Sequence, residues 1–130
     1  MSILALLLNA TLFGGMVFFS FGFAPVLFKQ LPMEQVRPLL RGTFPFYYLA
    51  VIALAAFAAL VAMLVSTLAA VLVSIICLST VYARQILMHQ INAATDAGNQ
   101  SLFNRLHGVS VVVQLIQIGL SGWAVVLLAF

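Results

Sequence analysis

Three long stretches without a charged residue limit what this chain can fold into more than any other feature. They cover residues 1–28, 42–83 and 106–130. A helix needs about 20 apolar residues to cross the hydrocarbon core of a bilayer, so the outer stretches hold one span each and the middle one is long enough for two. We predict an all-α integral membrane four-helix bundle, a single domain over residues 1–130, with spans near residues 3–28, 44–65, 69–92 and 104–129.

Composition excludes several classes of protein. Only 5% of the residues are charged and 65% are hydrophobic, whereas soluble domains carry about 25% charged residues. The five basic residues are too few and too scattered for a nucleic-acid surface, so we expect no nucleic-acid partner. The single cysteine, Cys77, excludes a disulfide within the chain and a CxxC metal motif. Because the first basic residue, Lys29, follows the first apolar stretch, we interpret that stretch as a retained span rather than a signal peptide.

The link between the first two spans predicts a short amphipathic segment at the membrane surface. Within KQLPMEQVRPLLRGTF, apolar and charged residues fall on opposite sides of a helix: Met33, Val36 and Leu40 against Glu34, Arg37 and Arg41. We expect Pro38 to break this segment into two short turns. Thr43 would then cap the second span, with Pro45 tolerated in its first turn.

Small residues and helix breakers predict packing faces and turns in the remaining chain. Two spans carry small residues on one face, which allow another helix to approach closely. In the first span Gly14, Gly15 and Gly22 lack side chains, and Gly15 and Gly22 share one face with Thr11 and Phe18; in the second span the face consists of Ala55, Ala59 and Ala62. Pro25 should kink or thin the end of the first helix. Length places a turn near residues 66–67, Gly98 is expected to stop the third helix, and Asn99 or Ser101 to cap the fourth.

All five basic residues fall on one side of a four-span topology. Three lie between spans one and two and two flank the link between spans three and four: Lys29, Arg37, Arg41, Arg84 and Arg105. The positive-inside rule makes this side cytoplasmic and both termini non-cytoplasmic. The loops at residues 29–43 and 93–103 are therefore expected in the cytoplasm, and the membrane is the inner membrane if the cell is bacterial.

The last span carries polar residues spaced three, four, three and four apart. They are His107, Ser110, Gln114, Gln117 and Ser121. At 3.6 residues per turn this spacing forms one narrow stripe, and an unpaired amide in hydrocarbon is costly, so the stripe should face protein or water. Two interpretations stay open: hydrogen bonds that hold the helices together, or a polar seam that lines a cavity for a small solute, ion or cofactor.

Other spans offer polar residues that fit the opposite side of this seam. They are Ser74, Cys77, Thr80, Arg84 and Gln85 in the third span, and Asn9, Met16 and Ser20 in the first. Arg84 and Arg105 stand at helix ends, where arginine commonly anchors a helix at the membrane surface.

The histidines raise the question of a cofactor. His89 and His107 lie toward the same side of the membrane and, with Cys77, are candidate ligands for haem or a metal. No HxxxH or ExxH spacing accompanies them, and hydrogen bonding at the polar edge is the alternative. The cofactor stays open between haem, copper and none. The chain has no nucleophile–base set and no glycine-rich phosphate loop, which favours a non-enzymatic protein.

Three phrases carry a family resemblance in their order along the chain: FFSFGFAPVLF at 18–28, FPFYY at 44–48 and FNRLHGVS at 103–110. They resemble the small multi-pass family whose eukaryotic members are called transmembrane protein 205 and whose bacterial members form a domain of unknown function. The resemblance implies a four-span bundle and a distant similarity to copper-resistance D-like and protoporphyrinogen-oxidase-type membrane families. It also marks pattern positions, which are Pro25, Phe44, Pro45, Tyr47, Leu106, His107, Gly108 and Ser110.

Three hypotheses for the function follow. The first is a non-enzymatic module in the lipid bilayer whose polar seam binds or passes a small polar or metal-containing ligand from the cytoplasmic side. The second is an accessory or assembly subunit of a larger membrane complex, joined through the small-residue faces, and a homo-oligomer is the alternative assembly that would speak against it. The third is a haem- or copper-handling membrane protein.

Overall fold

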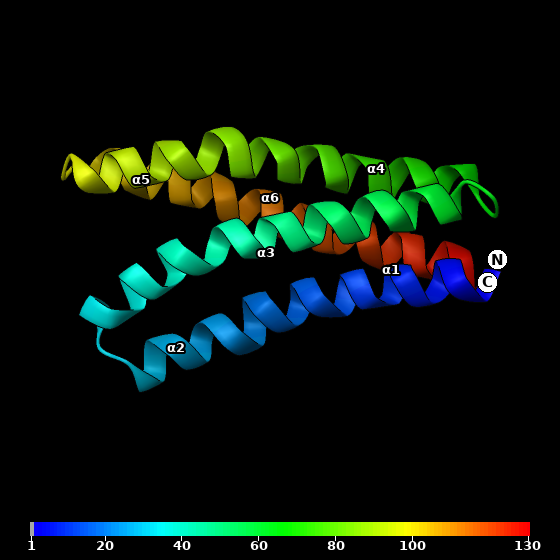
Figure 1. The fold of residues 1–130 in the computed structure, drawn as a ribbon, viewed down its shortest axis with the longest axis horizontal. Helices are drawn as coiled ribbons and strands as arrows, with labels where there is room; N and C mark the ends of the chain where they lie inside the picture. Colours follow the sequence, from blue (N-terminus) through cyan, green and yellow to red (C-terminus); the bar gives the residue numbers. More distant parts are fainter. Residues whose placement is uncertain (1) are drawn as a thin grey trace.

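The computed structural model describes residues 2–130, which form four long helical rods side by side (Figure 1). The rods cover Ser2–Gln30, Met33–Ala62, Thr67–Asp96 and Gln100–Ala129. At 1.5 Å per residue each rod is about 45 Å long, which matches a bilayer together with its headgroup regions. Each rod is long and apolar enough to cross a membrane. The protein is therefore an all-helical, multi-pass membrane protein, as the uncharged stretches predict.

The first rod changes its hydrogen-bond pattern just before Pro25. It consists of α1 (Ser2–Val17), a π-helical segment η1 (Phe18–Phe23) and α2 (Ala24–Gln30). The backbone N–H of Ala24 donates to the carbonyl of Phe19, five residues back. Proline lacks an N–H and crowds the carbonyl four residues before it, so the backbone widens by one residue at this point. The predicted distortion near Pro25 thus takes the form of a π-helical segment.

The second rod corrects the prediction of a separate surface segment. A single helix, α3, runs without a break over Met33–Ala62 and contains both Pro38 and Pro45. Thr43 does not cap a helix, because its hydroxyl donates to the Leu39 carbonyl inside α3 at 2.7 Å. Proline is tolerated in a membrane helix where water or neighbouring groups satisfy the freed carbonyl, and Pro38 lies in an exposed part of the rod. The amphipathic segment is the first part of α3.

The third and fourth rods form a long hairpin. The third contains α4 (Thr67–Tyr82), π-helical η2 (Ala83–Leu87) and α5 (Met88–Asp96), and the fourth is α6 (Gln100–Ala129). Ser66 caps α4 by accepting a hydrogen bond from the N–H of Ala69, which confirms the turn inferred near residues 66–67. Gly98 adopts φ +69°, a left-handed conformation that favours glycine, and Asn99 accepts from the N–H of Leu102 at 3.1 Å. The predicted stop and cap are confirmed.

The rods pack closely at one end and diverge toward the other (Figure 1). Near the termini the contact between α3 and α4 is made by small buried residues, which are Ala55, Ala58, Ala59, Ala62, Ala69 and Ala70. Alanine allows close helix approach in lipid, where packing rather than the hydrophobic effect holds helices together. Farther along the rods, near their middle, large rings stack between η1 and α3, and Phe19 lies on Tyr47 with ring centroids 3.9 Å apart. Side-chain size therefore explains why the bundle is wedge-shaped.

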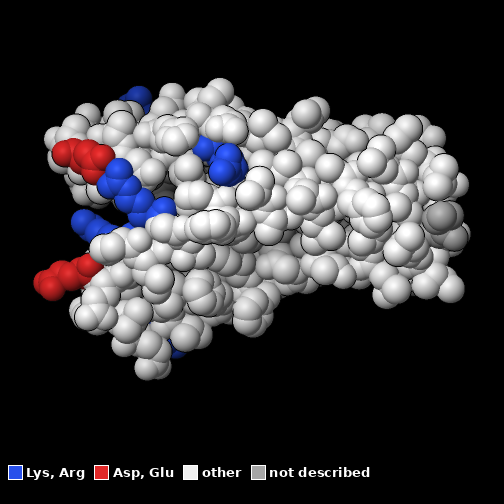
Figure 2. Space-filling view, viewed as in Figure 1, with Lys and Arg blue, Asp and Glu red and all other residues white. Residues whose placement is uncertain are grey.

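The two ends of the bundle also differ in charge. Both chain termini and the turn between α3 and α4 lie at the narrow end (Figure 1). The charged side chains gather in the opposite half, as Figure 2 shows. The half of the bundle toward the wide end therefore carries the formal net charge of +3.

Candidate functional site

The two glutamines of α6 face the interior of the bundle. Gln117 is only 4% exposed, and its side-chain amide donates to the hydroxyls of Ser79 at 2.7 Å and Thr80 at 3.0 Å on α4. Gln114 lies about one turn away, and its amide donates to the hydroxyls of Ser20 at 2.9 Å and Tyr47. Each amide nitrogen carries two hydrogens and has two acceptors, so every N–H of the two amides is hydrogen-bonded.

These hydrogen bonds join α6 to every other rod. Gln117 connects α6 to α4, and Gln114 connects it to η1 and to α3. Ser121 is buried and donates to the carbonyl of Ile118 in its own helix. Of the two alternatives for the stripe, this geometry matches hydrogen bonding between helices, because neither glutamine lines either of the two described cavities. Below the wide end, the two glutamine side chains therefore link the helices through hydrogen bonds.

Removing the Gln117 amide is expected to destabilise the bundle modestly. Gln117→Leu should lower the free energy of unfolding by about 1 kcal/mol, because interhelical hydrogen bonds in membranes contribute about 0.6–1.7 kcal/mol each. Thr80 and Ser79 keep their own hydrogen bonds to the Ile76 carbonyl, so neither hydroxyl is left unpaired. Unfolding in mixed micelles measures the change, with the exposed Gln85→Leu as control. Equal stability of the Gln117 variant and the parent would contradict the hydrogen bonds described here.

A cavity of about 620 Å³ lies between the diverging rods at the wide end. We call it the end cavity. Its apolar walls come from all four rods and include Phe28 of α2, Met33, Val36, Leu40 and Phe44 of α3, Met88 and Ile91 of α5, and Phe103 of α6. Its polar lining includes Arg37, Arg41, Tyr48, Asn92, His107 and Ser110. The end cavity therefore combines a large apolar surface with a cluster of hydrogen-bond donors and two guanidinium groups.

One ion pair stands beside this cavity. Both terminal guanidinium nitrogens of Arg41, Nη1 and Nη2, donate to the carboxylate of Asp96, at 2.7 and 2.9 Å, and so tie α3 to the end of α5. It is the one ion pair that the structure records among residues 2–130. Arg37 lines the same cavity one turn away on α3 without a carboxylate partner in that part of the chain. No local pattern predicts this pairing, since the two residues are 55 positions apart in the chain.

The residues predicted to form one polar seam divide into separate environments. His107 and Ser110 line the end cavity, and His107 stacks on Phe103 with ring centroids 5.7 Å apart. Arg84 is half-buried and donates from Nε to the Pro45 carbonyl at 3.3 Å, so it holds η2 against α3. Gln85, which the sequence placed in the seam, is exposed and takes no part in it. Successive residues of a helix point about 100° apart, so adjacent residues such as Arg84 and Gln85 lie in different surroundings.

Of the other residues predicted opposite the glutamines, some bond the glutamine amides and others do not. Ser20 and Thr80 do bond the glutamine amides. Asn9 is fully buried but donates to the Ala5 carbonyl of its own helix, and its Oδ1 has no hydrogen-bond partner among residues 2–130. Tyr47 and Ser79 are partners that the sequence analysis missed. Tyr47 lies in a run of aromatic residues, a pattern that predicts an anchor at the membrane surface and not a hydrogen bond to another helix.

The candidate metal ligands do not gather at one point. His89 is exposed and does not line the end cavity, whereas His107 does. Cys77 lies between α3 and α4, where its thiol contacts the Ile52 carbonyl at 3.7 Å. In residues 2–130 no three histidine, cysteine, aspartate or glutamate side chains come together in a way that could hold a metal ion.

The glycines predicted to be packing sites are not all contacted by another helix of this chain. A Cβ atom placed at Gly14, Gly15 or Gly108 would meet no neighbouring element within 4 Å, so no helix of this chain approaches them closely. At Gly22 a Cβ would stand 3.3 Å from the ring of Phe18, one turn back in the same helix. The expected close approach is therefore absent at Gly14 and Gly15, and α6 meets the first rod elsewhere, where a Cβ at Gly122 would stand 3.1 Å from the ring of Phe13.

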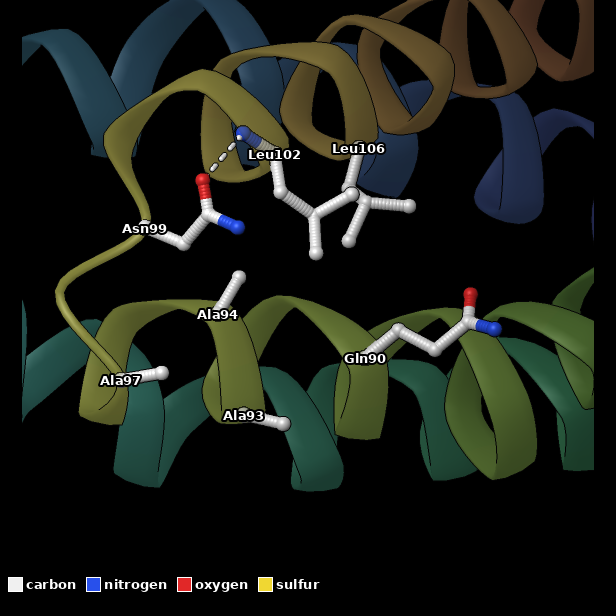
Figure 3. Close-up of a pocket in the computed structure, with 7 residues that line it drawn as sticks. All are labelled: Gln90, Ala93, Ala94, Ala97, Asn99, Leu102 and Leu106. Carbon is white, nitrogen blue, oxygen red and sulfur yellow. Dashed lines mark hydrogen bonds between the residues drawn. The ribbon is translucent and has the colours of Figure 1, made fainter.

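A smaller cavity of about 290 Å³ lies at the tip of the hairpin between α5 and α6. Leu102 and Leu106 of α6 point toward α5 across it, and Asn99 caps α6 at its end (Figure 3). Its lining contains no charged side chain and only two amides, those of Gln90 and Asn99. It offers less chemistry for recognition than the end cavity does.

Comparison with known families places the chain. A family model described as "Domain of unknown function (DUF4149)" matches residues 7–100, which is more than half of the chain. The match includes the parts of α2, α3 and α5 that line the end cavity and stops at the beginning of α6. No curated protein and no solved structure matches the chain. The protein thus belongs to the family of membrane proteins that carry this domain of unknown function, DUF4149.

Proposed function

We propose that this protein is a non-enzymatic membrane module that binds a small ligand in the end cavity. The observation that carries the proposal is the cavity itself, whose volume of about 620 Å³ lies within the usual range of ligand sites, about 300–1,000 Å³. Predominantly apolar walls with a few convergent polar groups are typical of such sites. The glutamine bonds beneath it support a fixed floor rather than a passage through the bundle.

The proposal includes an orientation and a relationship. The clustering of basic residues at the wide end supports a cytoplasmic location for that end by the positive-inside rule, so the cavity would open toward the cytoplasm. In a bacterial cell the membrane would be the inner membrane. The phrases at 18–28, 44–48 and 103–110 further support a relationship to the transmembrane protein 205 family.

Filling the cavity is expected to abolish ligand retention. Ser110 lines the end cavity from α6, and Ser110→Phe would place a ring in it. Native mass spectrometry of protein extracted gently from membranes should show a bound small molecule on the parent chain and none on this variant. The matched control is Ser101→Phe, which makes the same exchange on the exposed surface of α6, outside both cavities. A parent chain that carries no small molecule, or equal retention by both variants, would refute the proposal.

A second candidate is a role as an accessory subunit or homo-oligomer. It is favoured by the exposed face at Gly14 and Gly15, where no helix of this chain approaches. Small residues on a lipid-facing surface suit the close approach of a second membrane helix. The same mass spectra report on this candidate, because the intact mass distinguishes a single chain from a homo-oligomer or a larger complex.

A further inference from the structure

We infer that the end cavity takes an amphiphile with a phosphate headgroup, and that Arg37 is the residue that binds the phosphate. The inference rests on the proposed function and specifies its ligand class. Three properties of the lining carry it: the balance of charge, the supply of neutral donors and the apolar walls. The charge comes from two arginines of α3, and the donors and the apolar walls come from residues that several rods bring to one place.

The charge of the lining is positive and uncompensated. Two arginines line the cavity, and no aspartate or glutamate does. Arg41 donates two of its N–H groups to the carboxylate of Asp96, which neutralises its charge. Arg37 has no ion-pair partner among residues 2–130, so one full positive charge faces the cavity without a counter-ion from the described chain. A guanidinium fork matches the geometry of two phosphate oxygens, which makes phosphate a suitable counter-ion.

Neutral donors complete an anion site. Tyr48, only 8% exposed, and Ser110 line the cavity with hydroxyl groups, and Asn92 lines it with an amide. His107 adds an imidazole from α6. The oxygens of an ionised phosphate accept hydrogen bonds, so one phosphate can accept from donors that surround it on several sides. The four groups come from α3, α5 and α6, which gives the site its width.

The apolar walls exclude a bare anion as the natural occupant. Aromatic and aliphatic side chains from α2, α3, α5 and α6 form most of the lining. Water in contact with these walls is released when an apolar body replaces it, and inorganic phosphate has no such body. A ligand with a charged head and an apolar tail uses both parts of the lining.

The position of the end cavity relative to the bilayer makes the surrounding membrane one source of such a ligand. The rods are about 45 Å long, as long as a bilayer with its headgroups is thick, so the wide end lies at headgroup level. Anionic phospholipids hold their phosphates at that depth. A soluble amphiphile such as an alkyl phosphate has the same chemistry and would enter from the aqueous side. The two sources share one site and differ in the experiment that detects them.

Binding should depend on Arg37 and not on charge in general. The full chain is reconstituted in phosphatidylcholine nanodiscs and titrated by calorimetry with hexyl phosphate and with inorganic phosphate. Phosphatidylglycerol is tested separately, by native mass spectrometry after mixing it into the nanodiscs. Arg37→Gln should weaken binding about tenfold, the effect of losing one charge-assisted contact. Arg105→Gln removes the same charge from α6 outside the cavity and should leave binding unchanged.

The outcomes separate this inference from the proposed function. Arg37-dependent binding of phosphatidylglycerol, of hexyl phosphate or of both supports the inference and identifies the source. It is overturned if inorganic phosphate binds as tightly as hexyl phosphate, if both arginine variants lose affinity equally, or if no phosphate compound binds. A neutral molecule retained by the parent chain and displaced by Ser110→Phe would overturn the inference and leave the proposed function intact. Thermal unfolding of Arg37→Gln should match the parent, because Arg37 is exposed and makes no ion pair among residues 2–130.

Discussion

Replacing Ala55 with leucine is expected to lower the free energy of unfolding by about 1–3 kcal/mol, the usual cost of overpacking. Ala55 is 0% exposed and lies in the contact between α3 and α4, which the structure fills with alanines. A leucine has three more carbons, and the neighbouring helix must move away to admit them. Because the narrow end sets the angle at which the rods diverge, the same variant should also retain less ligand in the end cavity.

Ala56→Leu is the matched control for this variant. Ala56 is adjacent in α3 but exposed to lipid, so the larger side chain meets only acyl chains. Unfolding of both variants in mixed micelles compares them directly. If the Ala55 variant were as stable as the Ala56 variant, the tight contact of α3 with α4 would be wrong.

Truncating Leu12 is expected to destabilise the bundle by about 2 kcal/mol, the lower end of the range for buried leucine. Leu12 is 1% exposed in α1 and belongs to the buried cluster that joins α1 to the other rods. In lipid the unfolded spans remain in an apolar solvent, so little transfer free energy is lost. The cost comes from the space that the missing side chain leaves unfilled and from its lost contacts.

The control for Leu12→Ala is Leu7→Ala in the same helix. Leu7 is 58% exposed, so lipid replaces the missing atoms and the stability should stay within about 0.5 kcal/mol of the parent. Thermal unfolding in one detergent provides the measurement for both. Similar losses at the two positions would contradict the assignment of Leu12 to the interior.

The amino-acid sequence by itself determined the number of rods, the turns that separate the second, third and fourth rods, and the inward side of the last one. These features are local: uncharged length decides a span, Gly98 and Asn99 end and begin helices, and a three-four spacing places Gln114 and Gln117 on one face. Each depends on residues within a few turns of one another. A polar group in lipid is costly whatever its partner, so its direction is predictable before the partner is known.

Only the tertiary structure decided which residues meet. The pairing of Gln114 with Tyr47, the ion pair of Arg41 with Asp96 and the end cavity itself depend on how the rods rotate and slide against each other. Hydrophobicity carries little of that information here, because these helices are apolar on nearly every side. The continuity of α3 through Pro38 is of the same kind, since the exposed position of the proline at the wide end allows the helix to continue. Side-chain size, with alanine near the narrow end and aromatic rings from the middle of the rods onward, then gave the wedge that opens the cavity.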